Sequence, residues 1–199
     1  PDGAGFFQRR HVTFAHRRLA IRDVAGGAQP WLADDGQSAL VYNGEIYNDR
    51  ELRSDLRSRG HRFRSQCDTE TVMAAWREWG VDCVDRLNGM FAFGIYDFRD
   101  DTLFLARDRC GIKPLFFTVQ DSSLIFASSL AALLAHPRID ARPHWPAISH
   151  YLTTFRLTLG RETVYEDLLQ LLPAERLIWK RGEFAIETYW SPPRCEPQA

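Results

Sequence analysis

The sequence contains few of the residues that mark secreted or metal-binding proteins. Its 199 residues include four cysteines, without C-x-x-C spacing, and no H-E-x-x-H motif. So sparse a set cannot build a disulfide framework and provides no paired metal ligands. No secretory leader is visible in the printed chain. We therefore expect a reduced, cytoplasmic, metal-free chain. Its cysteines are Cys67, Cys83, Cys110 and Cys195.

Neither sign of charge is in excess, and long apolar runs are also lacking. The chain has 25 basic and 26 acidic residues, for a formal net charge of -1. A nucleic-acid or anionic-membrane surface would require surplus cationic charge, and a membrane span would require a much longer apolar run. The one basic run, Arg50 to Arg64, carries Glu51 and Asp55 within helical reach of its arginines, which predicts a solvated helix face. We expect neither nucleic acid nor membrane as a partner.

Apolar and aromatic residues, in contrast, are plentiful. They make up 45% and 13% of the chain, enough for the core of one domain. Several runs are almost continuously apolar, which is typical of sheets covered on both faces. Strand-like composition bounded by turn residues predicts strands over residues 12–21, 38–47, 90–98, 101–108, 114–119 and 123–128, and a closing hairpin over 175–190.

Helices are predicted between these strands. Asn48, with Glu51 three positions on, predicts a capping box that opens a helix ended by Gly60. Asp68 is a candidate N-cap for a second helix that ends at Gly80. Shorter helical patterns cover residues 84–87, 130–136 and 146–155. The order of elements predicts one α+β domain in which two antiparallel sheets are stacked between helices.

Three short polar stretches interrupt the apolar pattern. Arg18 follows a strand, Asn43-Gly44-Glu45 lies near the end of another, and Asp68 begins a helix. Taken singly, each has an ordinary structural interpretation: a snorkelling surface arginine, an Asn-Gly turn and a helix cap. Taken together, they contain one guanidinium for a carboxylate, two acids for an ammonium group, and an amide beside a glycine N–H for an oxyanion. If they converge, they fit a free α-amino acid whose side-chain carbonyl is attacked.

The order of motifs along the chain adds a family resemblance. "H-x-RLAI-x-D", "GAQP", "NGEIYN", "DTE", "LNGMFAF", "ARDR-x-GIKPL" and "FASS" follow one another. The series resembles the glutaminase domain of glutamine-dependent asparagine synthetases, a class II amidotransferase. The resemblance implies a four-layer αββα N-terminal-nucleophile hydrolase fold whose first strand and helix are missing here. It implies an amidotransferase domain over residues 1–190, truncated at its start, and the beginning of a linker over 191–199.

The resemblance also implies a role for each polar stretch. Arg18 would hold the α-carboxylate of L-glutamine, and Asn43 and Gly44 would form the oxyanion hole. Glu45 and Asp68 would bind the α-ammonium group. The rest of the pocket would be lined by Leu19, Ala20, Ile21 and Arg22.

The nucleophile in this family is a cysteine at the start of the mature chain, with its own α-amino group as the base. This sequence begins inside the "HRGPDG" motif that follows that cysteine. Cys67 adjoins Asp68, whose carboxylate raises a thiol pKa, and Cys83 and Cys110 lie in apolar patterns typical of buried residues. We therefore expect that the 199-residue chain lacks the nucleophile and is inactive alone.

The parent protein is expected to pass ammonia to an ATP-dependent synthetase domain that amidates aspartate. ATP and Mg would bind that partner domain, because no Gly/Ser-rich pyrophosphate loop occurs here, and this domain would need no cofactor. A homodimer stays open. The alternatives are a non-catalytic scaffold or binding domain, as in relatives of β-lactam synthetase or lasso-peptide cyclases, and an amidotransferase for a cell-surface sugar. The complete polar set favours the glutaminase, since a scaffold has no chemical need for an oxyanion hole.

Overall fold

The computed structural model describes residues 3–18, 23, 26–156 and 158–193. Its strands are β1 (Gly3–Arg9), β2 (Val12–Arg18), β3 (Trp31–Leu32), β4 (Ser38–Ile46), β5 (Gly89–Asp97), β6 (Thr102–Arg107), β7 (Phe116–Gln120), β8 (Ser123–Ala127), β9 (Leu169–Gln170), β10 (Glu175–Lys180) and β11 (Glu183–Thr188). Its α-helices are α1 (Asp49–Ser58), α2 (Asp68–Trp79), α3 (Cys83–Arg86), α4 (Leu130–Leu134) and α5 (Trp145–Thr154), and a 3-10 turn covers Gly80–Asp82.

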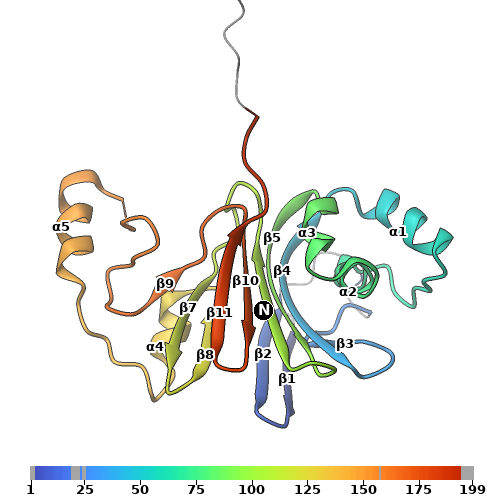
Figure 1. Ribbon diagram of the computed structural model, residues 1–199, viewed down its shortest axis with the longest axis horizontal. Helices are drawn as coiled ribbons and strands as arrows, with labels where there is room; N and C mark the ends of the chain where they lie inside the picture. The colour runs from blue at the N-terminus through green and yellow to red at the C-terminus, as the bar shows by residue number, and fades with distance from the viewer. Residues whose placement is uncertain (1–2, 19–22, 24–25, 157, 194–199) are drawn as a thin grey trace, which may run out of the picture.

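A six-stranded antiparallel sheet forms the centre of the molecule, in the order β11-β10-β6-β5-β4-β3 (Figure 1). Its middle strands carry the near-continuous apolar runs, and every residue of β6 is buried. The predicted closing hairpin is confirmed as β10 and β11, which pair from Glu175–Thr188 to Lys180–Glu183. The sheet is therefore covered on both faces, as its composition predicts.

The helices α1, α2 and α3 cover one face of this sheet (Figure 1). Leu56 of α1 and Val72 and Trp76 of α2 share a core with Phe91 and Phe104 of the strands. The Trp76 and Phe104 rings stack with their centroids 5.0 Å apart. The apolar stripe predicted for the second helix is confirmed, because these side chains meet the sheet.

Two smaller antiparallel sheets, β1-β2 and β8-β7-β9, pack on the opposite face. Phe14 of β2 and Phe126 of β8 meet edge to face, with their ring centroids 5.8 Å apart. The outer face of β8-β7 is covered by α4, where Leu133 packs near Phe116 and Ile125. The order helix, sheet, sheet, helix confirms the expected α+β fold with stacked antiparallel sheets, and the second sheet layer is divided into two.

Two predicted helix caps are wrong in their chemistry. Asn48 stands at the N-cap of α1, but its side chain makes no capping bond. Instead its amide donates to the Arg86 carbonyl and accepts from the Asn88 N–H, because α1 starts against the segment that leads into β5. The N-cap of α2 is Cys67, and Asp68 is the first helical residue. Its carboxylate reaches β4 rather than the helix backbone.

Two predictions of exposure are also wrong. The basic run on α1 is not wholly solvated, because Arg53 is only 4% exposed and pairs with Asp49 one turn earlier. Cys110, predicted to fill the core, is exposed. It stands in a turn where the Asp108 carboxylate accepts from the N–H groups of Cys110, Ile112 and Lys113, which directs the cysteine side chain outward.

Candidate functional site

The outer edge of β4 is the centre of the candidate site. Strand β3 pairs with β4 only at Ala39 and Leu40, so the remainder of this edge has no strand partner among the described residues. At Tyr42 the Gln29 side chain takes the place of a strand partner. It accepts from the Tyr42 N–H at 2.7 Å and donates to the Tyr42 carbonyl at 2.9 Å. Four residues on, the Ile46 N–H donates to Asp68 Oδ2 at 3.0 Å.

These bonds determine the direction of the Gly44 N–H. In an antiparallel strand, alternate residues point their backbone groups to the same edge. Tyr42 and Ile46 both point away from β5, so Gly44 between them does too. The Tyr42 N–H donates to Gln29 and the Ile46 N–H donates to Asp68. Gly44 has no strand opposite it on this side in the described part of the chain. The N–H of Gly44 is thus available to an acceptor outside the sheet.

Asn43 and Glu45 lie on the face of β4 turned toward the smaller sheets. They alternate with Tyr42 and Ile46, which pack in the helix-side core, and they follow Val41 on the other face. Both are half-buried. No hydrogen bond or ion pair joins either side chain to another described residue. The Asn-Gly pair therefore does not make a turn, and its polar groups are presented from within a strand.

Asp68 is held against this strand from the opposite side. It is 5% exposed, and its Oδ2 accepts from the Tyr42 hydroxyl at 2.8 Å as well as from the Ile46 N–H. Burial, together with the Asp68 carboxylate, raises the pKa of Tyr42 far above its ordinary value, so the phenol stays a donor. Among the described residues, Oδ1 accepts only the weak thiol donor of Cys67, at 3.8 Å, and so keeps the capacity for a further donor.

Arg18, at the end of β2, reaches the same region. Its Nη2 donates to the Asp23 carbonyl at 2.8 Å. The guanidinium lies over Gly27, since a Cβ at that glycine would collide with it and lie 2.8 Å from Cys67 Sγ. Arg18 is therefore brought beside Cys67, the residue before Asp68. Leu19, Ala20, Ile21 and Arg22 lie outside the described residues.

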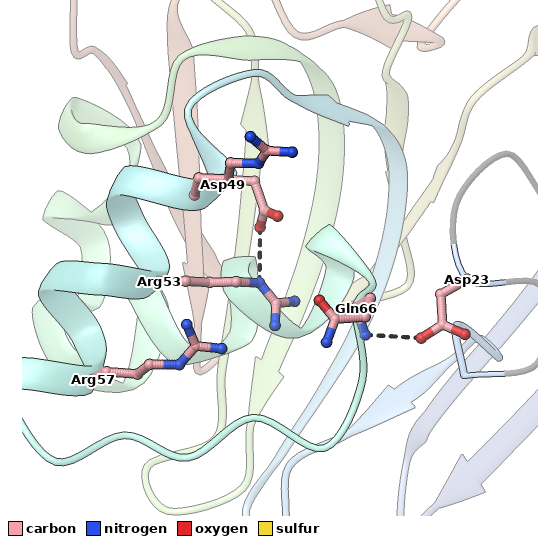
Figure 2. Close-up of a pocket in the computed structure, with 6 residues that line it drawn as sticks. Asp23, Asp49, Arg53, Arg57 and Gln66 are labelled. Atoms are coloured by element: carbon pink, nitrogen blue, oxygen red, sulfur yellow. Dashed lines mark hydrogen bonds and ion pairs between the residues drawn. The ribbon is translucent and has the colours of Figure 1, made fainter.

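Two residues of the site were not predicted as site residues. Asp23 accepts from the Gln66 N–H at 2.8 Å, and Arg53 donates to the carbonyls of Ser65 and Cys67 at 2.8 and 2.6 Å. Asp23 and Arg53 line a polar pocket of about 460 Å³ beside the site, and Figure 2 shows both directed toward the segment of Gln66. The pocket's described lining includes none of Arg18, Asn43, Gly44, Glu45 and Asp68. The aspartate that ends "H-x-RLAI-x-D" was the available signal for Asp23. No sequence signal indicated Arg53, because its burial depends on tertiary packing.

Neither Cys67 nor Cys83 is an activated thiol. Burial raises the pKa of Cys67, and the neighbouring Asp68 carboxylate adds to the rise, although bonds with Thr69 and the charge of Arg18 oppose it. Burial likewise raises the pKa of Cys83 well above its ordinary value. A raised pKa lowers the thiolate fraction on which nucleophilic attack depends. Among the described residues, no group of three or more His, Cys, Asp or Glu is placed to hold a metal ion, and no helix is long and apolar enough to cross a membrane.

The glutamine amidotransferase domain family matches residues 1–190. The chain belongs to this family, and the class predicted from its motifs is confirmed. It is 39% identical to asparagine synthetase [glutamine-hydrolyzing] 3 of Bacillus subtilis (strain 168), covering 96% of this chain and 31% of that protein. It is 38% identical to a probable asparagine synthetase [glutamine-hydrolyzing] of Schizosaccharomyces pombe, covering 76% of this chain and 27% of that protein. The chain spans between about a fifth and a third of the length of the curated relatives it matches.

Solved structures show the same fold at low identity. The glutamine phosphoribosylpyrophosphate amidotransferase of B. subtilis superposes with a TM-score of 0.62 at 20% identity, covering 90% of this chain and 35% of that chain. A glutamine aminotransferase class-II domain protein from Silicibacter pomeroyi gives a TM-score of 0.54 at 12% identity, covering 94% and 90% of the two chains. The expected N-terminal-nucleophile hydrolase fold is thereby confirmed.

Proposed function

We propose that this domain binds L-glutamine and hydrolyses its side-chain amide within an asparagine synthetase. The observation that carries the proposal is the available pair of donors on β4. The Gly44 N–H points to an edge with no strand partner, and the adjacent Asn43 amide has no hydrogen-bond partner among the described residues. Two such donors can stabilise the oxyanion formed when the glutamine amide carbon is attacked.

The charged groups around β4 suit the other end of the substrate. Arg18 would bind the α-carboxylate, and Glu45 with Oδ1 of Asp68 would accept from the α-ammonium group. Asp68 is pre-positioned by its bonds to Tyr42 and Ile46. The substrate would then be oriented with its amide at the β4 donors, and such positioning of the reacting group raises the rate. Leu19, Ala20, Ile21 and Arg22 remain proposed lining residues.

We propose that the nucleophile comes from a segment that precedes these 199 residues. A cysteine thiolate there would attack the amide carbon, ammonia would leave, and water would hydrolyse the thioester to glutamate. The raised pKa values of Cys67 and Cys83 support this division of roles. The 199-residue chain alone is then expected to release no ammonia from glutamine above the level of a denatured control.

The synthetase half of the reaction belongs, in this proposal, to a further domain of the intact protein. That domain would bind ATP and Mg, take up the ammonia and amidate aspartate in the cytoplasm. Residues 191–199 would begin the linker to it, after an amidotransferase domain over 1–190. The names of the asparagine synthetases support aspartate as the acceptor, since the chain is 39% identical to one of them over nearly its whole length.

Glutamine-dependent ammonia release by the intact protein tests the proposal. The Asn43→Ala variant is expected to lower kcat by about 10²–10³, the cost of removing one oxyanion donor. The exposed Asn88 serves as the matched control, and Asn88→Ala should leave kcat within about twofold. Both variants should still bind glutamine, as measured by calorimetry. An intact protein without glutamine affinity, or an Asn43→Ala variant with the wild-type rate, would overturn the assignment.

A further inference from the structure

Asp23 joins two segments that are far apart in the sequence. One carboxylate oxygen accepts from the Gln66 N–H at 2.8 Å, across 43 positions of the chain (Figure 2). The other accepts from the Gly26 N–H at 2.8 Å. These two N–H groups hold the pKa of Asp23 below its ordinary value, so the carboxylate stays charged at neutral pH. Asp23 thus ties its own loop to the segment that leads into α2.

Each end of this link leads to a residue of the proposed glutamine site. The Asp23 carbonyl accepts from Arg18 Nη2 at 2.8 Å and also from the Gly27 N–H at 3.1 Å. Gln66, bonded to the carboxylate, stands two positions before Asp68. The main chain of Asp23 therefore holds the group proposed for the α-carboxylate, and its side chain holds the segment that carries a group proposed for the α-ammonium.

The backbone of the Asp23 loop requires glycine at positions 26 and 27. Asp23 has a φ of 45°, in the left-handed region that aspartate tolerates better than most residues. A Cβ on Gly26 would collide with the Asp23 carboxylate, and one on Gly27 would collide with the Arg18 guanidinium. The two glycines let the loop close around Asp23, so its carboxylate and carbonyl can serve different partners.

Arg53 fixes the other side of the same segment. It donates to the carbonyls of Ser65 and Cys67 on either side of Gln66, and its Nε donates to Asp49 at 3.1 Å. Asp49 also accepts from the Thr71 hydroxyl at 2.6 Å. Arg53 of α1 thus holds residues 65–67 in place. Because the Gln66 N–H is bonded to Asp23, the loop that contacts Arg18 is held at a fixed position relative to these residues.

We propose that Asp23 is a positioning residue that sets the separation of Arg18 and Asp68, and thereby the selectivity for the α-amino-acid end of glutamine. The proposal rests on the proposed glutaminase function. Asp23 need not touch substrate, since both of its carboxylate oxygens are used within the protein. Its effect should therefore appear in KM and in discrimination between substrates rather than in the chemical step.

The test compares Asp23→Asn with wild type in the intact protein. The amide keeps the size of the side chain but places a donor opposite one of the two N–H groups. Loss of one bond to a charged acceptor predicts a KM for glutamine about tenfold higher, with kcat within about twofold. Asp23→Ser, which retains one short acceptor, should give an intermediate KM if the asparagine variant folds poorly.

Two glutamine analogues provide a readout that a merely structural role would not move. Glutaramic acid lacks the α-amino group, and 4-aminobutanamide lacks the α-carboxylate. Wild type should bind glutamine more tightly than either analogue. Asp23→Asn should reduce both affinity ratios, glutamine over each analogue, by about tenfold, because misplaced Arg18 and Asp68 no longer bind the two charged groups of glutamine together. Inhibition of glutamine hydrolysis gives the affinity of each analogue.

Asp35→Asn is the matched control. Asp35 is an exposed aspartate that also accepts from a backbone N–H, that of Gln37 at 2.9 Å, and it lies in the turn between β3 and β4. It should leave KM and both preferences unchanged. Unchanged preferences in Asp23→Asn, whether KM stays or rises, would overturn the positioning role. A wild-type protein that does not bind glutamine would instead refute the proposed function, and the two failures are distinguishable.

Discussion

Gly44 serves the sheet and the candidate site at once. Its pairing partner on β5 is Phe91. A Cβ on Gly44 would collide with the Met90 carbonyl oxygen and lie 2.7 Å from Phe91 Cα. Only glycine lets β4 and β5 approach this closely while an N–H points to the outer edge. The residue that offers the proposed oxyanion donor is therefore also required by strand packing.

Gly44→Ala is expected to destabilise the fold, because the obstructing atoms are backbone atoms that cannot rotate away. Overpacking of this kind costs about 1–3 kcal/mol. Urea unfolding followed by circular dichroism measures the change. Gly3→Ala is the control, since a Cβ there meets nothing within 4 Å. Equal stabilities of the two variants would contradict the close approach.

Arg53 is a second residue whose role its neighbours decide. Its side chain is 5% exposed, like its partner Asp49 at 7%, and it also holds two backbone carbonyls. Removing one member of a buried ion pair leaves the other charge uncompensated.

Arg53→Met should therefore lower the free energy of unfolding by about 3–5 kcal/mol. Arg59→Met, at the C-cap of the same helix, should cost far less, because Arg59 is 41% exposed in its ion pair with Asp55 and water screens the pair. Chemical denaturation of the two variants measures the difference. A similar loss in both would show that burial does not govern this pair.

At the scale of the element, α1 and α5 differ in what their apolar residues contact. Leu56 of α1 is fully buried against the central sheet. Trp145 and Leu152 of α5 and Phe155 at its C-cap are, in contrast, 69%, 70% and 82% exposed. Figure 1 shows α5 standing apart from the sheets. The same residue type thus has opposite roles in two helices of similar length.

Leucine truncation separates the two helices. Leu56→Ala should cost about 2–5 kcal/mol, since the cavity it leaves is enclosed by the sheet and α2. Leu152→Ala should change the free energy of unfolding by less than about 0.5 kcal/mol. Thermal or urea unfolding of both variants checks this contrast, and a large loss at Leu152 would show that α5 contributes to the core.

On the acid side of neutrality, the shifted groups of the whole molecule make stability depend on pH with one sign. Burial lowers the pKa of His16, so the unfolded chain binds more protons as the pH falls through about 6.5. The pKa of Glu78 is lowered by its bond with His61. Burial alone would raise the pKa of Asp97, but bonds from Arg99 and Trp76 outweigh it and lower it. Carboxyl groups with lowered pKa values contribute stability above about pH 4 that is lost in acid.

Stability should therefore fall in two stages as the pH is lowered, first as the pH falls through about 6.5, the ordinary pKa of histidine, and again below about pH 4. His16→Gln should abolish the first stage, and His150→Gln, at another half-buried histidine, should retain it. Urea midpoints measured across this range test the assignment. Stability that rises on acidification, or a first stage that survives in His16→Gln, would contradict it.

Much of the architecture could be predicted because its signals are local. The apolar runs of β5 and β6, the stripe of Val72 and Trp76, and the turn between β10 and β11 are visible in short windows of sequence. The two predicted capping bonds were wrong where a longer-range bond was available. Asn48 could satisfy a nearby helix N–H, but it bonds to Arg86 and Asn88 instead, since the fold brings them to it.

The sequence alone determined the α+β class, the ordered motifs of the family and the residue types of the candidate site. Only the tertiary structure decided that Arg18 comes to lie beside Cys67 and that Asp68 is bonded to β4, 22 positions from Ile46. It also decided that Gly44 stands in a strand edge and that Asp23 links two distant loops. Periodicity depends on neighbours in the chain, whereas hydrogen-bond partners depend on which segments packing brings together.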